Sequence, residues 1–139
     1  PHEGEMGRLL QCSASSIAEN RIAASCALSQ YFGCTTVLKG PGTIVVSPEG
    51  EIAINPTGNS DLATAGSGDV LTGIIASLLA QGKSSFISAV IGVFLHGLAA
   101  DLYQKKSHQL LASDIVTYLP YAIKVVKNCE YRLPIVDGD

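Results

Sequence analysis

The first third of the chain shows the spacing of apolar positions that is typical of helices. We predict a short helix at residues 5–10, followed by one long helix that starts after a serine cap at residues 13–16 and runs to about Phe32. Gly33 follows and marks the end of this long helix. The apolar positions predicted to share one of its faces are Ile17, Ile22, Ala24, Leu28 and Phe32.

The pattern then changes to that of β-strands. The sequence TTVLKG at residues 35–40 is rich in β-branched residues and predicts a strand. Residues 43–47 and 51–55 flank a Pro-Glu-Gly turn, so they predict a hairpin. Residues 55–68 consist mostly of threonine, glycine, asparagine, serine and alanine, which is typical of a loop.

Three helices are predicted for the rest of the chain. The first spans residues 70–81 and the second runs from residue 84 to about residue 105. A third begins at residues 112–115, is interrupted or restarted by Pro120, and precedes a polar tail after Leu133. The order of helix, strand, hairpin and three helices predicts an α/β fold with few strands.

One of these helices is apolar enough to need a test for membrane insertion. Residues 84–100 carry no formal charge, but they are fewer than the roughly 20 residues of a typical membrane-spanning helix and include serine, histidine and glycine. We therefore expect a helix that is buried between protein layers, and no contact with a membrane.

Composition limits the kind of protein and the kind of partner. The 139 residues are the size of one domain, and a hydrophobic content of 47% is sufficient for a core. The net charge is −3 and the basic residues are scattered, which argues against nucleic acid and favours a small-molecule partner. Four unclustered cysteines and an N-terminal segment without signal-peptide character predict reduced thiols in a cytoplasmic protein.

The sequence AGSGD, residues 65–69, stands directly before an apolar helix and is the first candidate site. Backbone N–H groups at a helix N-terminus attract anions, and Gly66, Ser67 and Gly68 would let a phosphate approach them. Asp69 would then face the other reactant and act as a general base. An ordinary helix cap with a tight turn explains the same letters about equally well.

The sequence LKGPGT, residues 38–43, is the second candidate. Lys39 at a strand end, together with Gly40 and Gly42, could contact a nucleotide phosphate or sugar, although a plain turn with a solvated lysine is the simpler interpretation. His96 stands in the apolar helix, where a hydrogen-bonded core histidine is the expected role.

Taken together, these segments resemble a known family. VLKGPGTIVVSPEGEIAINPTGN, LATAGSGDVLTGIIASLLAQG and GVFLHGLAADL are similar, in order and spacing, to motifs of the carbohydrate-kinase-like NAD(P)H-hydrate dehydratases of the ribokinase-like superfamily. PHEGEM at residues 1–6 resembles that family's P-H-P-G-E-M motif, and LLASDIVTYLP resembles its closing helix. The resemblance implies a three-layer α/β/α fold and a lyase that restores NADH or NADPH from the hydrated cofactor.

The resemblance also implies roles for individual residues. His2 would contact the hydrated substrate, and Asp69 would meet it as the catalytic base. The N-terminal amides of residues 66–68 would stabilise the transferred phosphoryl group from ADP or ATP, with Mg²⁺ bridging the phosphates. Metal ligands on the protein stay unassigned. The nucleotide would be bound by Lys39, Gly40, Pro41, Gly42, Thr43 and Gly68.

This sequence departs from the family pattern in residue type and in length. Glu3 stands where the family usually has proline, and Ala65 where a second glycine is often found. Because family domains are longer, residues 1–139 are expected to be the C-terminal portion of a single ribokinase-like domain. Such a portion would have an unpaired strand edge, so we expect a homo-oligomer or association with a missing N-terminal half.

Two other functions remain open from the sequence. A ribokinase-like kinase of a small alcohol, such as a hydroxymethylpyrimidine or a sugar, would share the GSGD segment. A non-catalytic nucleotide-binding subunit or fragment would also keep these motifs. The choices between ADP and ATP, and between hydrated NADH and hydrated NADPH, stay open as well.

Overall fold

The computed structural model describes residues 1–103, 109–128 and 130. The end of the second apolar helix near residue 105, Cys129 and the tail after Leu133 therefore lie outside the described residues. The elements, in chain order, are α1 (Glu3–Leu10), α2 (Ala14–Glu19), α3 (Arg21–Phe32), β1 (Thr36–Leu38), β2 (Ile44–Val46), β3 (Ile52–Ile54), the 3₁₀ turn η1 (Ser60–Leu62), α4 (Ser67–Ala80), α5 (Ser85–Tyr103) and α6 (Ala112–Lys127).

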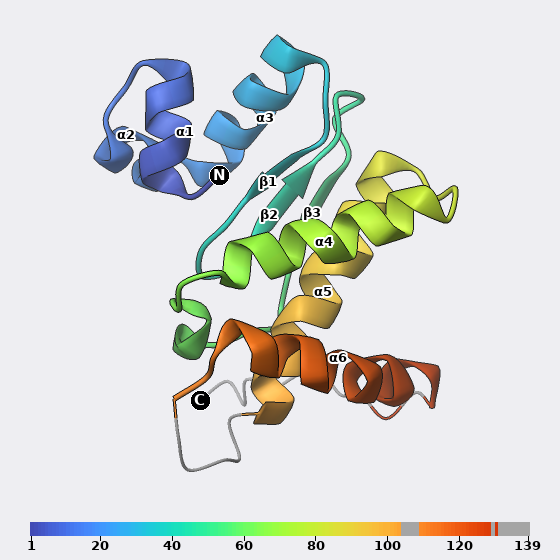
Figure 1. Ribbon diagram of the computed structural model, residues 1–139. Helices are drawn as coiled ribbons and strands as arrows, with labels where there is room; N and C mark the ends of the chain where they lie inside the picture. The colour runs from blue at the N-terminus through green and yellow to red at the C-terminus, as the bar shows by residue number, and fades with distance from the viewer. Residues whose placement is uncertain (104–108, 129, 131–139) are drawn as a thin grey trace, which may run out of the picture.

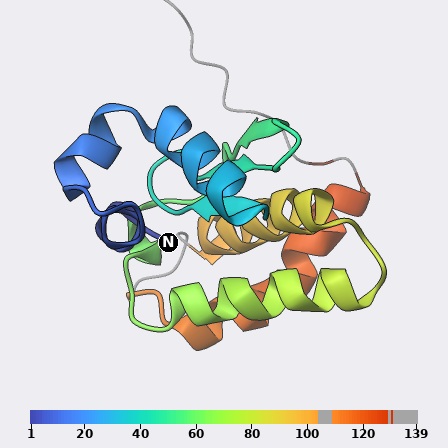
Figure 2. The same cartoon turned by 90° about the horizontal axis from the view of Figure 1, so that it is seen from above.

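The three strands form one antiparallel sheet in the order β1-β2-β3, with β2 in the centre. Val45 pairs with Val37 on one side and with Ala53 on the other. The predicted strand and the predicted hairpin are both confirmed. Helices α1 to α3 lie on one side of this sheet and α4 and α5 on the other, with α6 beyond α5 (Figures 1 and 2). The described residues therefore build three layers, helix, sheet and helix.

The alternation of side chains along β2 explains these layers. Ile44 and Val46 pack in one cluster with Met6, Ile17 and Leu28 of the first three helices. Val45 points the opposite way and joins a cluster of residues from α4 and α5, namely Leu71, Ala89 and Val93. Because successive strand residues face opposite sides, a fully apolar strand such as β2 has to be covered on both faces.

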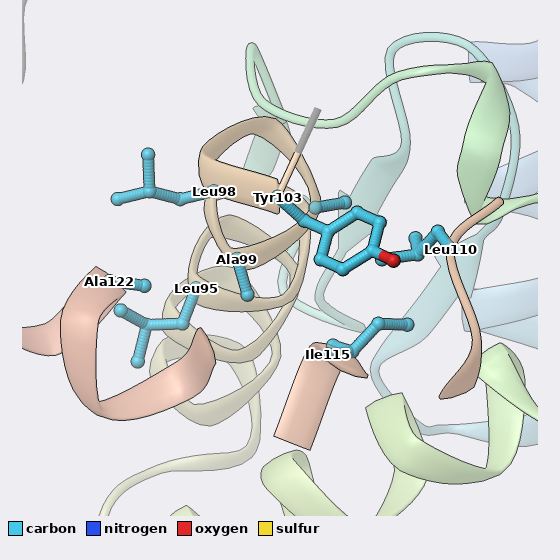
Figure 3. Close-up of a cluster of buried hydrophobic side chains, with 8 residues drawn as sticks. Leu95, Leu98, Ala99, Tyr103, Leu110, Ile115 and Ala122 are labelled. Atoms are coloured by element: carbon cyan, nitrogen blue, oxygen red, sulfur yellow. The ribbon is translucent and has the colours of Figure 1, made fainter. Parts of the chain in front are cut away.

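Helix α5 is the central element of the second half. It packs against β2, α4 and α6, and Leu95, Ala99 and Tyr103 contribute to a buried cluster with Leu110 and Ile115 (Figure 3). By length and composition alone α5 could cross a membrane, but half of its apolar stretch is buried inside the protein. The expectation of a helix buried between layers is confirmed.

The prediction of one long helix from residue 13 to Phe32 was wrong. Ser13 does cap a helix, through its hydroxyl and the Ser16 N–H, but Asn20 ends α2 and its side chain accepts from the Ala23 N–H to begin α3. An asparagine side chain competes with the helical hydrogen bonds, which explains the break. The new helix direction leaves Ile22 and Phe32 exposed, in contrast to their predicted place on the apolar face.

Pro120 does not interrupt α6. The helix runs from Ala112 to Lys127 with the proline inside it. Ile115 and Ala122, on either side of the proline, are both fully buried against α5. This packing compensates for the hydrogen bond that a proline cannot donate inside a helix.

Candidate functional site

Three segments meet at the end of the sheet where β1 terminates. They are residues 1–5, the turn at residues 39–43, and the N-terminus of α4. The Lys39 N–H donates to the Pro1 carbonyl at 2.7 Å. The Lys39 ammonium nitrogen would lie 3.4 Å from a Cβ placed on Gly68. The two sequence candidates are therefore neighbours in space.

An open hollow of about 130 Å³ lies between these segments. This volume is room for a few water molecules, at about 30 Å³ each, or for a group of phosphate size. The polar side chains in its lining are those of Lys39 and Thr72, and the remaining lining residues contribute apolar side chains or backbone. The hollow is lined by Pro1, Val37, Lys39, Gly68, Leu71, Thr72 and Ile75.

The N-terminus of α4 is open to an incoming anion. Gly66, the residue before the helix, has a φ of +83°, and no side chain caps the helix there. The first N–H groups of a helix have no partner within it and favour an anion, and Gly68 in this first turn also lines the hollow. Asp69 lies in the first turn and is exposed. The simpler interpretation, a helix cap formed by the Asp69 side chain, is not what the structure contains.

Ser67 contributes differently from what the sequence suggested. Its hydroxyl donates to the Leu62 carbonyl at 2.7 Å, and its own carbonyl oxygen lies 2.9 Å from Nε2 of His96. The Ser67 N–H also donates, to the Thr64 carbonyl at 3.3 Å. All three polar groups of the residue are thereby used to hold the loop in place.

His96 is a buried histidine whose role matches the prediction of a hydrogen-bonded core residue. Only 7% of its surface is exposed. Because a carbonyl can only accept, Nε2 must donate to Ser67. Burial lowers the pKa of His96 from its ordinary value of 6.5, and the hydrogen bond to Ser67 raises it by a smaller amount. The neutral ring thus ties the α4 N-terminus to α5.

The turn at residues 39–43 depends on two glycines and on an arginine far away in sequence. Gly40 and Gly42 have φ values of +142° and +60°, which other residues rarely adopt. The Thr43 hydroxyl donates to the Gly40 carbonyl at 3.1 Å. Arg21, at the start of α3, donates to the backbone carbonyls of this turn. These acceptors are Leu38, Lys39, Pro41 and Gly42.

Helix α1 supplies the carboxylates that face the basic side chains of the site. Lys39 forms an ion pair with Glu5 at 3.4 Å, and Arg21 forms one with Glu3 at 3.1 Å. The pKa of Glu5 is lowered, mainly because its carboxylate accepts the His2 backbone N–H and also because Lys39 is near. The negative charge that Glu3 adds is therefore balanced by Arg21.

His2 has a structural role that the sequence did not predict. Its Nδ1 accepts from the N–H groups of Gly4 and Glu5 at 3.1 and 3.3 Å, so it is the N-cap of α1. With Glu5 bonded back to the His2 backbone, the pair forms a capping box. The side chain is 53% exposed, and its Nε2 edge lies 3.6 Å from Glu5.

The loop NPTGN is held against α5 and does not line the hollow described above. The Thr57 hydroxyl donates to the Phe94 carbonyl at 2.9 Å. Asp101 accepts from the Gly58 N–H at 2.8 Å and from the Asn59 side chain at 2.9 Å. Asp101 was missed from the sequence, although a single charge in an otherwise uncharged apolar helix is a usable signal.

The other departure in residue type, Ala65, causes no backbone strain. Gln11 is the single non-glycine residue with a positive φ in the described part of the chain, so Ala65 has an ordinary conformation.

Cys12, Cys26 and Cys34 are free thiols, as expected. No group of three or more histidine, cysteine, aspartate or glutamate side chains converges among the residues that the structure describes.

Comparisons with known proteins agree with the geometry. The carbohydrate-kinase-type family described as NAD(P)H-hydrate dehydratase matches residues 1–121. The ADP-dependent (S)-NAD(P)H-hydrate dehydratase of Neisseria meningitidis is 50% identical over 118 residues, which are 83% of this chain and 40% of that protein. The bifunctional NAD(P)H-hydrate repair enzyme Nnr of Moorella thermoacetica is 43% identical over 138 residues, covering 98% of this chain and 26% of that enzyme.

Solved structures give the same result for the fold. The ADP/ATP-dependent NAD(P)H-hydrate dehydratase of Bacillus subtilis, co-crystallised with ATP and Mg²⁺, superposes with a TM-score of 0.84 at 33% identity. The superposition covers 89% of this chain and 46% of that one. The predicted α/β, ribokinase-like class and the family resemblance are confirmed, and the chain spans less than half the length of these relatives.

Proposed function

Because the chain belongs to the NAD(P)H-hydrate dehydratase family, we propose that it provides the nucleotide site of an enzyme that dehydrates (S)-NAD(P)H hydrate. In this proposal residues 1–139 are the C-terminal portion of one ribokinase-like domain. The reaction is metabolite repair: a nucleotide phosphorylates the hydrate hydroxyl, and elimination of phosphate restores NADH or NADPH. The observation that carries the proposal is the convergence of Lys39 with the uncapped N-terminus of α4.

The residues at this convergence fit the phosphates of ADP or ATP. A helix N-terminus without a side-chain cap and an ammonium group both favour bound anions. Glycine at position 68 leaves the approach to Lys39 open. The turn at residues 40–43 lies beside Lys39 and would contact the rest of the nucleotide. Mg²⁺ would bind mainly through the nucleotide phosphates, with no protein ligand assigned, which leaves the exposed Asp69 free to meet the substrate.

When bound, the nucleotide with its Mg²⁺ supplies the phosphoryl group and neutralises part of its charge. Asp69 accepts the proton of the substrate hydroxyl as that oxygen attacks. The amides of Gly66 and Gly68 stabilise charge on the phosphoryl oxygens, and Lys39 supplies a further positive charge. His2 presents its Nε2 edge to the hydrated nicotinamide while Nδ1 keeps its capping bonds.

The relatives support the choice of ligands. The Neisseria protein is named ADP-dependent, and the Bacillus structure was obtained with ATP and Mg²⁺, so we propose ADP or ATP with Mg²⁺ here. We further propose a cytoplasmic protein that acts on a small molecule. Association with the remaining half of the domain, or with a second copy, would complete the substrate pocket.

The decisive test is turnover of hydrated NADH and of hydrated NADPH, each with Mg²⁺ and either ADP or ATP. The chain is assayed alone and after mixing with the other half of a family domain, by following the absorbance of the reduced nicotinamide. Asp69→Asn is expected to reduce the rate by about 10²- to 10⁴-fold, because it removes the general base. Glu49→Gln, an exposed carboxylate in the hairpin turn, is the matched control and should retain full activity.

Each outcome separates the alternatives. Turnover that depends on Asp69 supports the dehydratase. Phosphorylation of a hydroxymethylpyrimidine or a sugar, without recovery of the reduced cofactor, would assign a small-alcohol kinase instead. Tight ADP binding without turnover, whether the chain is alone or mixed with the other half, would indicate a non-catalytic nucleotide-binding subunit. Absence of both ADP binding and turnover would contradict the proposal.

A further inference from the structure

We propose that Arg21 is a positioning residue that fixes the conformation of the turn at residues 39–43, and that Glu3 holds Arg21 in place. This inference rests on the proposed function only where it concerns nucleotide binding. Arg21 begins α3, and Glu3 begins α1, and neither element contributes to the sheet (Figure 1). The contact therefore links the first helical layer to the loop that carries Lys39.

The guanidinium group acts on the backbone of the turn. Nη1 donates to the carbonyls of Pro41 and Gly42, the second at 3.4 Å, and Nη2 donates to those of Leu38 and Lys39 at 3.4 and 3.3 Å. A planar group with several fixed donors can hold carbonyls on both sides of a turn at once, which an ammonium group cannot do. Within the turn, the side-chain hydrogen bond is that of the Thr43 hydroxyl to the Gly40 carbonyl, and Arg21 adds the contacts to the other carbonyls.

Gly40 is part of the same arrangement. A Cβ at this position would lie 2.8 Å from Nη2 of Arg21 and 3.2 Å from Oε1 of Glu3. The positive φ favours glycine here, and any side chain would have to displace the guanidinium of Arg21 from the turn. The absence of a side chain lets the guanidinium pack directly on the backbone of the turn.

Glu3 is the residue that orients the arginine. Its Oε1 lies 3.1 Å from Nε of Arg21, in an ion pair in which the Arg21 side chain is 19% exposed. Nε is itself buried and has no partner with hydrogen-bond geometry in the described structure, so this interaction is electrostatic. Since proline is favoured at the first position of a helix, Glu3→Pro removes the carboxylate while preserving α1.

The consequence for binding follows from preorganisation. A turn that is already fixed loses little conformational entropy when a nucleotide binds. Releasing Arg21 should therefore weaken nucleotide binding and loosen the turn, while the helices that form the core keep their packing. A role limited to overall stability would not change the turn selectively.

The test uses two measurements on the full chain, hydrogen exchange of the Lys39 amide without ligand and ADP affinity by calorimetry. The Lys39 N–H donates to the Pro1 carbonyl, so its protection reports on the conformation of the turn. Arg21→Gln should speed exchange of this amide about tenfold or more, leave exchange in α4 and α5 unchanged, and weaken ADP binding about tenfold. Arg21→Lys should retain only part of the exchange protection and part of the ADP affinity. Glu3→Pro should change the exchange rate and the ADP affinity by less than Arg21→Gln does. Arg8→Gln removes an exposed arginine on α1 and should change neither.

Unchanged exchange of the Lys39 amide in Arg21→Gln would overturn the inference whether or not ADP binds. Faster exchange with unchanged ADP affinity would overturn the link to nucleotide binding. If the unmodified chain does not bind ADP while Arg21→Gln loosens the turn, the proposed function fails and the positioning role stands. Equal loss of protection throughout the chain would assign Arg21 to general stability and also overturn the inference.

Discussion

Nε2 of His96, in the middle of α5, lies 2.9 Å from the carbonyl oxygen of Ser67 at the start of α4. The bond joins residues 29 positions apart in the sequence, and it is made by a buried imidazole. The N-terminus of α4 is thus anchored to α5. Nε2 can donate in both protonation states, so a pH dependence arises from the burial of the charged ring rather than from loss of this bond.

The stability of the fold is expected to fall as the pH drops below about 6.5. The pKa of His96 is lowered by burial, so the unfolded chain takes up a proton in a pH range in which the folded chain does not. The loss starts at the unfolded value and ends once the pH is below the folded value. His96→Gln keeps a donor for Ser67 but does not titrate, so its thermal unfolding temperature should depend less on pH. An equal pH dependence in both proteins would contradict this assignment.

Ser67→Ala should reduce stability and change nucleotide binding little. The variant leaves the Leu62 carbonyl without its 2.7 Å partner, which costs about 1 kcal/mol of the free energy of unfolding. Since the hydroxyl proton is donated to Leu62, the ADP dissociation constant should change by less than about twofold. Urea unfolding and calorimetry measure the two effects, with the exposed Ser77→Ala as control. Strongly weakened ADP binding at unchanged stability would return Ser67 to the phosphate-binding role.

Lys39→Met should weaken ADP binding by about tenfold or more, because a charge-assisted contact to phosphate is lost. The effect should shrink at high salt, since the Lys39 side chain is 36% exposed and its charge is partly screened. Lys83→Met removes an equal charge from the exposed turn between α4 and α5 and is the control. The same binding loss in both variants would point to net charge as the cause.

Two glycine substitutions should have opposite effects on stability. In Gly97→Ala the new Cβ would meet the backbone of Thr57 and Gly58 at 2.7 and 2.8 Å, so the NPTGN loop must move and the loss is about 1–3 kcal/mol or more. In Gly73→Ala nothing lies within 4 Å of the new Cβ, and the better helix propensity should add about 0.5–1 kcal/mol. Urea unfolding measures the free energy of unfolding of both variants and of the unmodified chain. A stable Gly97→Ala would show that the loop is not held closely against α5.

Elements that depend on residues close together in the sequence were predicted correctly. The hairpin, the end of α3 at Gly33 and the α4 segment after AGSGD follow from local patterns, and the structure contains all three. Two predictions, a continuous helix through Asn20 and a break at Pro120, were wrong. At Asn20 a side-chain hydrogen bond ended a helix that the apolar pattern would have continued, and at Pro120 packing against α5 continued a helix that the local rule would have ended.

The sequence by itself determined most of the elements and the two candidate phosphate-binding segments, because these depend on residues a few positions apart. Only the tertiary structure decided what surrounds those segments. The contacts of Arg21 with the 39–43 turn, of His96 with Ser67 and of Asp101 with Gly58 join residues 18 to 43 positions apart. Such contacts leave no periodic signal, since they arise from the packing of whole helices against one sheet, and each is a single side chain meeting a backbone group that any residue could provide.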